Sequence, residues 1–397
     1  MYSRQALWHN ISHVPGASQT KIVSLMPTRI CDILGMEYPI FAFSHQRDVV
    51  AAVSKAGGLG VLGAVALGPD ALDVELAWLE EQLGDTPYGI DVIVPAHYVG
   101  DEQGGLEAKD LEAFIPQEQR DFVKGLLERY GVPDLPEGRE ASSGLLAWSA
   151  KGAASLLDIA LCHKPRLIAN ALGAPPPDMV KRAHDAGLLV AALAGRPEHA
   201  MKHKQAGVDI VVAQGYEAGG HTGELSTMVL VPQVVDAVAP MPVLAAGGIA
   251  CGRQMAAAMA LGAEGIWTGS VWLTTEEAET HPVVKEKFLA ATSYDTVRSR
   301  SLTGKPARQL KSAWNQSWDS SDSPDPLGMP LQTMLVSEAQ LRISRAAATS
   351  AGARDLITYF VGQVVGQLNQ VKPARRVLLD IVEEYADVLQ RMTEQLS

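Results

Sequence analysis

A single histidine, His221, stands in a glycine-rich loop, Tyr216–Gly223, which contains glycines at positions 219, 220 and 223. Glycine lets backbone N–H groups approach a ligand closely and tolerates positive φ angles. Imidazole can act as a general base near neutral pH, because its pKa lies close to the working pH of most enzymes. The loop is therefore either a catalytic site with His221 as the base or a tight turn that carries a solvated histidine.

Two later turns have the composition of an anion-binding site. The first contains Gly247 and Gly248, and the second contains Gly269 followed by Ser270. Each turn places backbone N–H groups at the start of a predicted helix, where they and the helix dipole favour a phosphate. They predict a cofactor or substrate with a phosphate group, although such turns can also serve only to start helices. The ten histidines show no HExxH pattern, so we predict no metal site.

All three loops follow short apolar segments that we interpret as buried strands. Eight such segments occur, each followed by a stretch with helical character: 38–42, 60–64, 88–94, 166–170, 188–193, 208–213, 242–246 and 265–268. Non-alternating strands that alternate with helices are typical of a parallel sheet with both faces covered. Eight repeats favour the α/β class and a closed (β/α)8 TIM barrel over an open doubly wound sheet. Barrel enzymes place their sites in the loops that follow the strands.

The rest of the chain divides around this barrel. We predict an N-terminal tail over 1–25, the barrel over 26–275 and a helical C-terminal cap over 276–397. A polar insertion after the third strand, at about 100–143, is either a lid or partner surface or an addition without function. The last predicted helix, 373–392, carries apolar residues at helical spacing and so has one face to bury.

The composition describes a soluble globular protein, since 47% of the 397 residues are hydrophobic and 20% are charged. The net charge of −12 argues against a nucleic acid or an anionic membrane as partner. No segment approaches the roughly 18 consecutive apolar residues of a membrane span, and the N-terminus lacks the apolar core of a secretion signal. Cys31, Cys162 and Cys251 form no disulfide or zinc pattern. We therefore expect a cytoplasmic protein.

Several of these segments together resemble one protein family, the nitronate monooxygenases, formerly called 2-nitropropane dioxygenases. The segment 213–223, Ala-Gln-Gly-Tyr-Glu-Ala-Gly-Gly-His-Thr-Gly, is similar to the central motif of the family. The segments 245–249 and 262–270 resemble its second and third glycine motifs, and 51–60 resembles its first helix and strand. The resemblance covers about 26–270 in order, with a weaker similarity at 304–308.

This resemblance implies a non-covalent FMN at the mouth of the barrel. The phosphate of FMN would lie on four residues, Gly247, Gly248, Gly269 and Ser270. The flavin ring and ribityl chain would lie along Gln214, Gly219 and Gly220. His221 would face the substrate and, as in family members that oxidise nitroalkanes, would take the α-proton.

The implied activity is the FMN-dependent oxidation of alkyl nitronates or nitroalkanes with molecular oxygen. An alternative is an FMN- and NAD(P)H-dependent reductase of enoyl thioesters or quinones, because related enoyl-ACP reductases share the barrel and a similar Gly-Gly-His loop. A third hypothesis is a flavin-binding accessory protein without turnover, which His221 and the polar mouth argue against. The expected partners are a small-molecule substrate and oxygen, with NAD(P)H and a homo-oligomer left open.

The sequence departs from the family at two places. The family usually has a Gln-Ala-Pro-Met type segment after the first strand, whereas this chain has Phe41–Arg47. This difference makes Ser44 and His45 candidates for the substrate site, although His45 could equally be a surface residue at the start of a helix. Asp91 stands where many members have asparagine, and its carboxylate would either repel an anionic substrate or bind a backbone amide.

Overall fold

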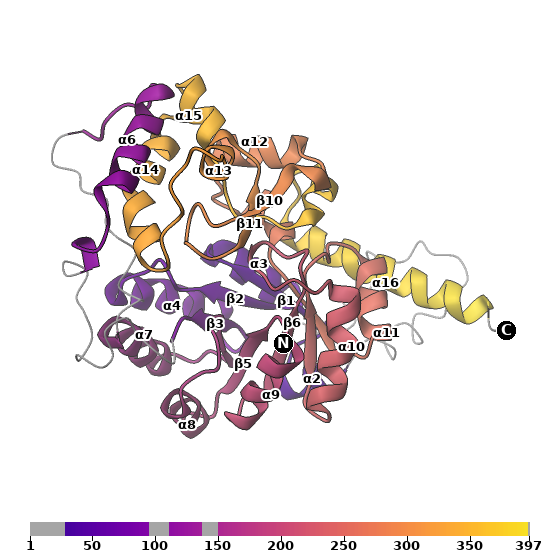
Figure 1. Cartoon of the computed structure of the whole chain (residues 1–397). Coiled ribbons are helices and arrows are strands. Elements are labelled where there is room, and N and C mark those ends of the chain that lie inside the picture. Colours follow the sequence, from indigo (N-terminus) through magenta and orange to yellow (C-terminus); the bar gives the residue numbers. More distant parts are fainter. Residues whose placement is uncertain (1–27, 95–110, 137–149, 396–397) are drawn as a thin grey trace.

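A computed structural model describes residues 28–94, 111–136 and 150–395. The predicted N-terminal tail and the two ends of the predicted insertion lie outside these residues. Eight parallel strands close into a barrel, which confirms the predicted fold class (Figure 1). In chain order they are β1 (Ile40–Ser44), β2 (Leu59–Gly63), β3 (Gly89–Val92), β4 (Leu167–Asn170), β5 (Leu189–Ala194), β6 (Ile210–Gln214), β8 (Val243–Ala246) and β9 (Gly265–Thr268).

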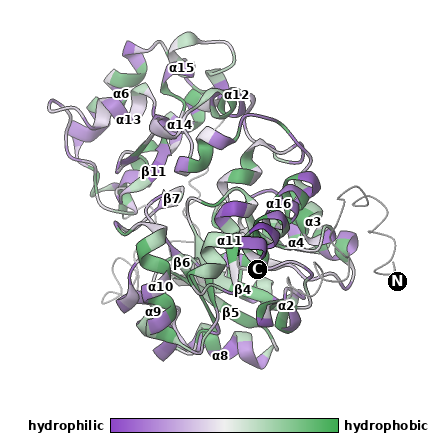
Figure 2. Cartoon of the chain, turned by 90° about the vertical axis from the view of Figure 1, so that its right-hand side faces the viewer, coloured by the Kyte–Doolittle hydropathy of each residue, from purple (hydrophilic) through white to green (hydrophobic). Residues whose placement is uncertain are grey.

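The barrel closes between its first and last strands, where Ile40 is the register partner of Ile266. Inward-facing side chains such as Phe41 and Trp267 fill the interior, while the alternate residues pack against the surrounding helices. Both faces of each strand are therefore buried, which explains the continuous apolar segments in the sequence. Figure 2 shows hydrophobic strands at the centre of the barrel and helices with one hydrophilic face outside them.

Among the described residues, the helices of the barrel are α2, which precedes β1, and seven that follow strands as expected for the fold. They are α2 (Arg29–Leu34), α3 (Arg47–Lys55), α4 (Pro69–Leu83), α7 (Ala150–Cys162), α8 (Pro177–Asp185), α9 (Pro197–Gln205), α10 (Thr227–Val238) and α11 (Gly252–Ala260). Gly187 and Gly207 lie just beyond the ends of α8 and α9, with φ angles of 75° and 86°. These left-handed conformations favour glycine and stop each helix before the next strand begins.

The cap is a second layer over the carboxyl ends of the barrel strands (Figure 1). Its helices are α6 (Gln117–Arg129), α12 (Pro282–Ala290), α13 (Ala313–Trp318), α14 (Leu331–Ala346) and α15 (Ala351–Leu356). The helix α6 comes from the predicted insertion, and its residue Phe122 packs edge-on against Trp318 with ring centroids 4.7 Å apart. Trp314 and Trp318 are both buried, so the two tryptophans form part of the core of the cap.

The cap also contains a small antiparallel sheet that the sequence did not predict. Its strands are β10 (Thr296–Ser299), β11 (Ala307–Leu310) and β7 (Gly220–His221), in the order β10-β11-β7. The predicted cap is not helical throughout, because α15 ends at Leu356 and Phe360 then forms a bridge with Gln309 of β11. A short 3-10 helix, η6 (Gln363–Gln367), follows.

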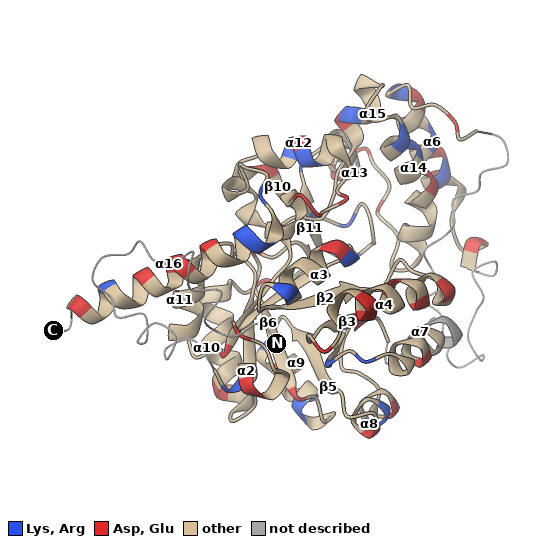
Figure 3. Cartoon of the chain, turned by 180° about the vertical axis from the view of Figure 1, so that it is seen from behind, with Lys and Arg blue, Asp and Glu red and all other residues tan. Residues whose placement is uncertain are grey.

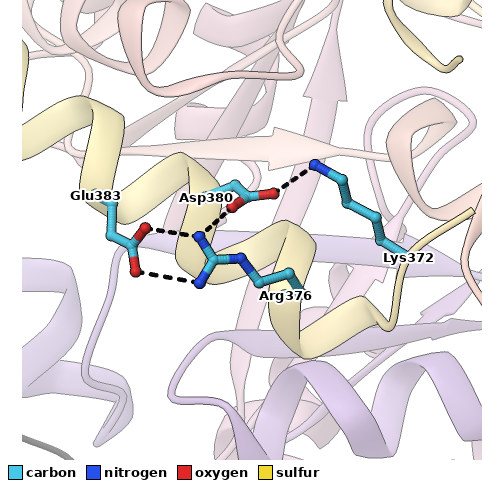
Figure 4. Close-up of polar contacts among 4 residues, drawn as sticks. All are labelled: Lys372, Arg376, Asp380 and Glu383. Carbon is cyan, nitrogen blue, oxygen red and sulfur yellow. Dashed lines mark hydrogen bonds and ion pairs between the residues drawn. The ribbon is translucent and has the colours of Figure 1, made fainter. Parts of the chain in front are cut away.

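The last helix, α16 (Ala374–Gln395), returns to the barrel and packs against α3 and α11. A Cβ atom on Gly252 would lie 2.2 Å from the backbone nitrogen of Tyr385, so this contact requires glycine. The exposed face carries an ion-pair network in which Lys372 lies 2.8 Å from Asp380 and Arg376 lies 2.7 Å from Glu383 (Figure 4). Exposed pairs contribute little to stability, so the buried face holds the helix in place.

Acidic and basic residues are spread over the outer helices of the barrel and the cap (Figure 3). In the part of the chain that the structure describes, none of the helices combines the length and apolar character required to cross a membrane.

Candidate active site

The predicted site loops meet at one edge of the barrel. The strands β6, β8 and β9 are neighbours in the sheet, so the loops that follow them lie side by side at the carboxyl ends of the strands. The cap lies over the same end of the barrel (Figure 1). The arrangement forms a mouth between barrel and cap, where barrel enzymes carry their sites.

His221 is held at the junction of the barrel and the cap. It belongs to β7, which lies in the loop after β6 but pairs with β11 of the cap, so that His221 is the register partner of Ala307. Its Nε2 atom lies 2.8 Å from the Oγ1 atom of Thr303, and its ring centroid lies 6.4 Å from that of Phe360. The imidazole is thus fixed by the cap, although it stands in a barrel loop.

The contact with Thr303 assigns the tautomer of His221. The Thr303 hydroxyl donates to the carbonyl oxygen of Lys305 at 3.2 Å, so it accepts a hydrogen bond from the Nε2–H group of His221. This assignment leaves Nδ1 as the basic nitrogen. Burial, with a smaller effect of the Lys305 charge, lowers the pKa of His221 to about 4. The imidazole is therefore neutral at pH 7 and is a weaker base than an ordinary histidine.

The two glycine turns fit a phosphate group. Gly247 and Gly248 have φ angles of 96° and 72°, and among the described residues no acceptor bonds to the N–H groups of Gly248, Ile249 or Gly269. The Oγ atom of Ser270 accepts a hydrogen bond of 2.8 Å from the N–H group of Gly362 and can still donate. Free N–H groups at the ends of two adjacent strands suit an anion.

Other structural facts agree with a ligand at this place. A cavity of about 520 Å³ is lined by Gly247 and Gly248 together with residues of α10, α11 and η6. A Cβ atom on Gly269 would meet only Phe43, at 3.8 Å from its Cδ1 atom. The protein itself therefore leaves room beside Gly269, and its own packing does not explain the absence of a side chain there.

Close packing against the cap is a further reason for glycine at position 219, beside the cofactor contact that the family resemblance implies. A Cβ atom on Gly219 would lie 2.8 Å from the backbone nitrogen of Gly362 in the cap, so close packing with the cap requires this glycine. Gly220 has a φ angle of 74°, and nothing lies within 4 Å of its Cβ position. Gln214 shares its register with the inward-facing Ala246, so its side chain points into the mouth.

The three substrate-site candidates come from two other strands: Ser44 and His45 lie at the end of β1, which neighbours β9, and Asp91 lies on β3. The Ser44 hydroxyl accepts a hydrogen bond of 3.1 Å from the N–H group of Gln46, at the start of α3. The Nδ1 atom of His45 donates to the carbonyl oxygen of Gly63 at 2.9 Å, and the residue is exposed. Asp91 is buried on the inner wall of the barrel.

Sequence reasoning missed the polar residues of the cap that hold the histidine loop. The guanidinium groups of Arg298 and Arg308 lie over the Tyr216 ring, at 5.0 Å and 4.4 Å from its centroid. Arg308 is buried and donates to the carbonyl oxygen of Tyr216 at 3.0 Å. The similarity at 304–308 was the only signal for Arg308, and there was none for Arg298, because their contact with the loop depends on the pairing of β10, β11 and β7.

Comparisons with known proteins support one family. The profile of the family described as nitronate monooxygenase matches residues 28–384. A Mycobacterium tuberculosis protein described as "Putative monooxygenase Rv1533" is 64% identical over 92% of this chain and 98% of its own length.

Two solved structures share the fold. A nitroalkane oxidase from Streptomyces ansochromogenes has a TM-score of 0.75 and 26% identity, over 91% of this chain and 99% of that one. FabK from Thermotoga maritima has a TM-score of 0.69 and 28% identity, over 93% of this chain and 99% of that one.

Proposed function

Because the chain belongs to the nitronate monooxygenase family, we propose that it is an FMN-dependent enzyme that oxidises alkyl nitronates, and less readily the parent nitroalkanes, with molecular oxygen. Its membership in this family indicates an oxidoreductase.

The glycine turns support FMN as the cofactor. Gly248, Ile249, Gly269 and Ser270 would hold one phosphate, and the sequence has no dinucleotide fingerprint for an adenine half. Gln214 would lie along the flavin, since its side chain points into the mouth. When bound, the flavin supplies the electron-accepting chemistry, and the protein positions the substrate and excludes water.

The observation that carries the proposal is the fixed, neutral imidazole of His221 above the barrel mouth. Its Nε2–H group is engaged with Thr303 at 2.8 Å, which leaves the Nδ1 lone pair for a substrate proton. A nitroalkane must lose its α-proton before oxidation, whereas a nitronate arrives without it. Since the pKa of His221 is lowered to about 4, proton removal from a nitroalkane is unfavourable, and the nitronate is the better substrate.

The alternative is an FMN- and NAD(P)H-dependent reductase of enoyl thioesters or quinones. The similarity to FabK, at 28% identity over 93% of this chain, supports it. In that case His221 would bind or protonate the reduced substrate and would not remove a proton. The two functions differ in the electron donor, which gives a direct test.

Anaerobic absorbance spectra of the purified protein would separate the two. We expect ethyl nitronate to bleach the flavin, and oxygen to restore its colour with consumption of the nitronate. NADH and NADPH, each added alone, should leave the flavin oxidised. Rapid bleaching by NADPH together with no response to the nitronate would overturn the proposed function and establish the reductase.

A further inference from the structure

The hairpin formed by β10 and β11 is a basic element in an acidic protein. The whole chain has a net charge of −12, whereas the segment 296–311 contains no aspartate or glutamate. The same segment contains five basic residues: Arg298, Arg300, Lys305, Arg308 and Lys311. This hairpin pairs with β7 and holds His221 through Thr303. The function proposed above assigns no role to the positive charge that it brings to the mouth.

Part of this charge is offset within the protein. Arg298 and Arg300 line a cavity of about 600 Å³ together with three carboxylates, those of Glu224, Asp319 and Asp325. Opposite charges around one cavity weaken each other's field at a distance. Lys311, at the end of the hairpin, interacts electrostatically with Asp295. Three of the five basic residues therefore contribute little to the field at the mouth.

The other two, Lys305 and Arg308, have no carboxylate partner among the described residues. Arg308 is buried and donates to neutral oxygens, the carbonyl of Tyr216 at 3.0 Å and Oγ1 of Thr296 at 3.1 Å. Lys305 is exposed, and within the described part of the chain its ammonium group has neither an ion pair nor a hydrogen bond. The side of the hairpin next to His221 thus keeps two positive charges that the protein does not neutralise.

Lys305 lies close to the imidazole through a short chain of contacts. Its carbonyl oxygen accepts a hydrogen bond of 3.2 Å from the Thr303 hydroxyl, which lies 2.8 Å from Nε2 of His221. It also stands two residues before Ala307, the register partner of His221. Burial and, after it, the Lys305 charge lower the pKa of His221, so this charge acts at the position of the ring. An anion beside the imidazole would lie in the same field.

The sign of this charge distinguishes the two substrate classes. A nitronate is an anion, whereas the parent nitroalkane is neutral, so a positive charge at the mouth attracts only the nitronate. The same charge opposes protonation of His221 and so makes it a weaker base toward a nitroalkane. We propose that Lys305 is a specificity-determining residue, whose ammonium group attracts the nitronate anion into the mouth and thereby favours nitronates over nitroalkanes.

This inference rests on the proposed function, because it takes a nitronate as the substrate. It goes further by assigning the preference for the anion to a cap residue that acts on the substrate itself and not only on the base. Because Lys305 is exposed, dissolved salt screens its charge. The screening length falls from about 10 Å at 0.1 M salt to about 3 Å at 1 M. The preference for the nitronate should therefore weaken as salt is added.

Ethyl nitronate and nitroethane form a matched pair for the first test, since they share a carbon skeleton and differ in charge. For flavin-loaded Lys305→Gln, we expect kcat/KM for ethyl nitronate to fall about fivefold, mainly through KM. The value for nitroethane should stay within about twofold of the wild type. Lys305→Arg keeps the charge and should behave as the wild type. The control is Lys202→Gln, at an exposed lysine of α9.

Ionic strength tests whether the effect is electrostatic. Raising the salt concentration from about 0.02 M to about 0.5 M should lower kcat/KM of the wild type for ethyl nitronate. The change should be much smaller in Lys305→Gln, and nitroethane should show no such dependence in either protein. A salt effect of the same size in Lys305→Gln and in the wild type would overturn the role of Lys305.

Nitrate gives a readout that does not need turnover, because it is a planar anion with the same O–N–O unit as a nitronate. It would be titrated into the flavin-loaded protein at constant ionic strength and followed through the flavin absorbance. We expect Lys305→Gln to raise the Kd of nitrate about fivefold, and Lys305→Arg and Lys202→Gln to match the wild type. A wild type that does not bind nitrate would contradict the inference.

The outcomes separate the inference from the proposed function. Equal losses of Lys305→Gln on ethyl nitronate and nitroethane would show that Lys305 acts by holding the hairpin, and would overturn its role in specificity. Unchanged kinetics and unchanged nitrate binding in this variant would do the same and leave the function intact. A wild type that binds nitrate in a Lys305-dependent way but does not react with ethyl nitronate would overturn the proposed function and leave Lys305 as an anion-attracting residue.

Discussion

The Nε2 atom of His221, in a loop of the barrel, lies 2.8 Å from the Oγ1 atom of Thr303, in the cap. Under the proposed function, this hydrogen bond assigns the Nε2–H tautomer and leaves Nδ1 as the base. It also ties the imidazole to a segment more than 80 residues away in the sequence. The predictions below follow from this contact and from the packing around it.

Removing the Thr303 hydroxyl should misplace the imidazole. For Thr303→Val, which keeps the shape of the side chain, we expect a loss of about 1 kcal/mol, or roughly fivefold in kcat/KM for ethyl nitronate. Thr303→Ser keeps a hydroxyl and should recover most of the activity. Steady-state kinetics of both variants, with flavin content as a control, would measure this. Equal losses in the serine and valine variants would show that the hydroxyl alone does not account for the effect.

Replacing His221 should separate the two substrate classes. His221→Asn should keep the flavin bound and lose about 10²–10⁴-fold in turnover of a nitroalkane, the usual contribution of a general base. Turnover of the nitronate should fall much less, because no proton has to be removed. His199→Asn, at an exposed histidine of α9, is the matched control. Equal activity of His221→Asn and wild type on both substrates would remove His221 from the mechanism.

The low pKa of His221 predicts an unusual pH profile for the nitroalkane reaction. The neutral imidazole is the active form, and its fraction falls only as pH drops through the pKa of about 4. Turnover of nitroethane should therefore stay nearly constant between pH 7 and pH 5, where a histidine with the ordinary value of 6.5 would lose most of its basic form. Turnover of nitroethane would be measured over this range, with protein stability checked at each pH. A loss of turnover that begins near pH 6.5 would contradict the lowered pKa.

Charge at Gly269 should prevent flavin binding. Gly269→Asp would place a carboxylate beside the phosphate, whereas Gly269→Ala adds only a methyl group that meets Phe43 at 3.8 Å. We expect Gly269→Asp to purify without flavin and Gly269→Ala to retain part of it, with both variants folded. The ratio of flavin absorbance to protein absorbance and a circular dichroism spectrum would measure this. Full flavin occupancy in Gly269→Asp would contradict the phosphate site.

The buried face of α16, and not its ion pairs, should hold the helix on the barrel. Ile381 is 1% exposed, so Ile381→Ala should cost about 2–5 kcal/mol of unfolding free energy. Arg376→Ala, which breaks the exposed network on the same helix, should cost less than about 1 kcal/mol. Chemical denaturation of both variants gives the comparison. A larger loss in Arg376→Ala than in Ile381→Ala would reverse this account of α16.

The barrel could be predicted from the sequence because each of its strands has a recognisable local sequence pattern. Each is a short apolar segment bounded by glycine, proline or polar residues, and the closed topology then places the loops after β6, β8 and β9 together. The seven residues expected to bind the cofactor therefore lie at one mouth, although their contacts with FMN stay a prediction. Local patterns say less about single side chains: His203 of α9 is 1% exposed and donates to the carbonyl oxygen of Leu193 at 2.9 Å.

The cap sheet could not be predicted, because its strands carry no local pattern. The segments Thr296–Ser299 and Ala307–Leu310 are polar and short, and their strand conformation depends on pairing with each other and with Gly220–His221. The contact between His221 and Thr303 depends on that same pairing. The sequence also could not decide whether His45 is a surface residue or part of the site. Its hydrogen bond to Gly63 of β2 forms only when the two strands are neighbours.

Because β7 pairs with β11, the glycine turns and the fixed position of His221 form at different times during synthesis. During synthesis the barrel strands are complete once Thr268 has been added, and both glycine turns are present once Ser270 follows. The imidazole of His221 gains its fixed position only when β11, ending at Leu310, has been made and has folded against it. A nascent chain, or one whose cap has opened locally, would thus have its glycine turns while His221 is not yet held in place.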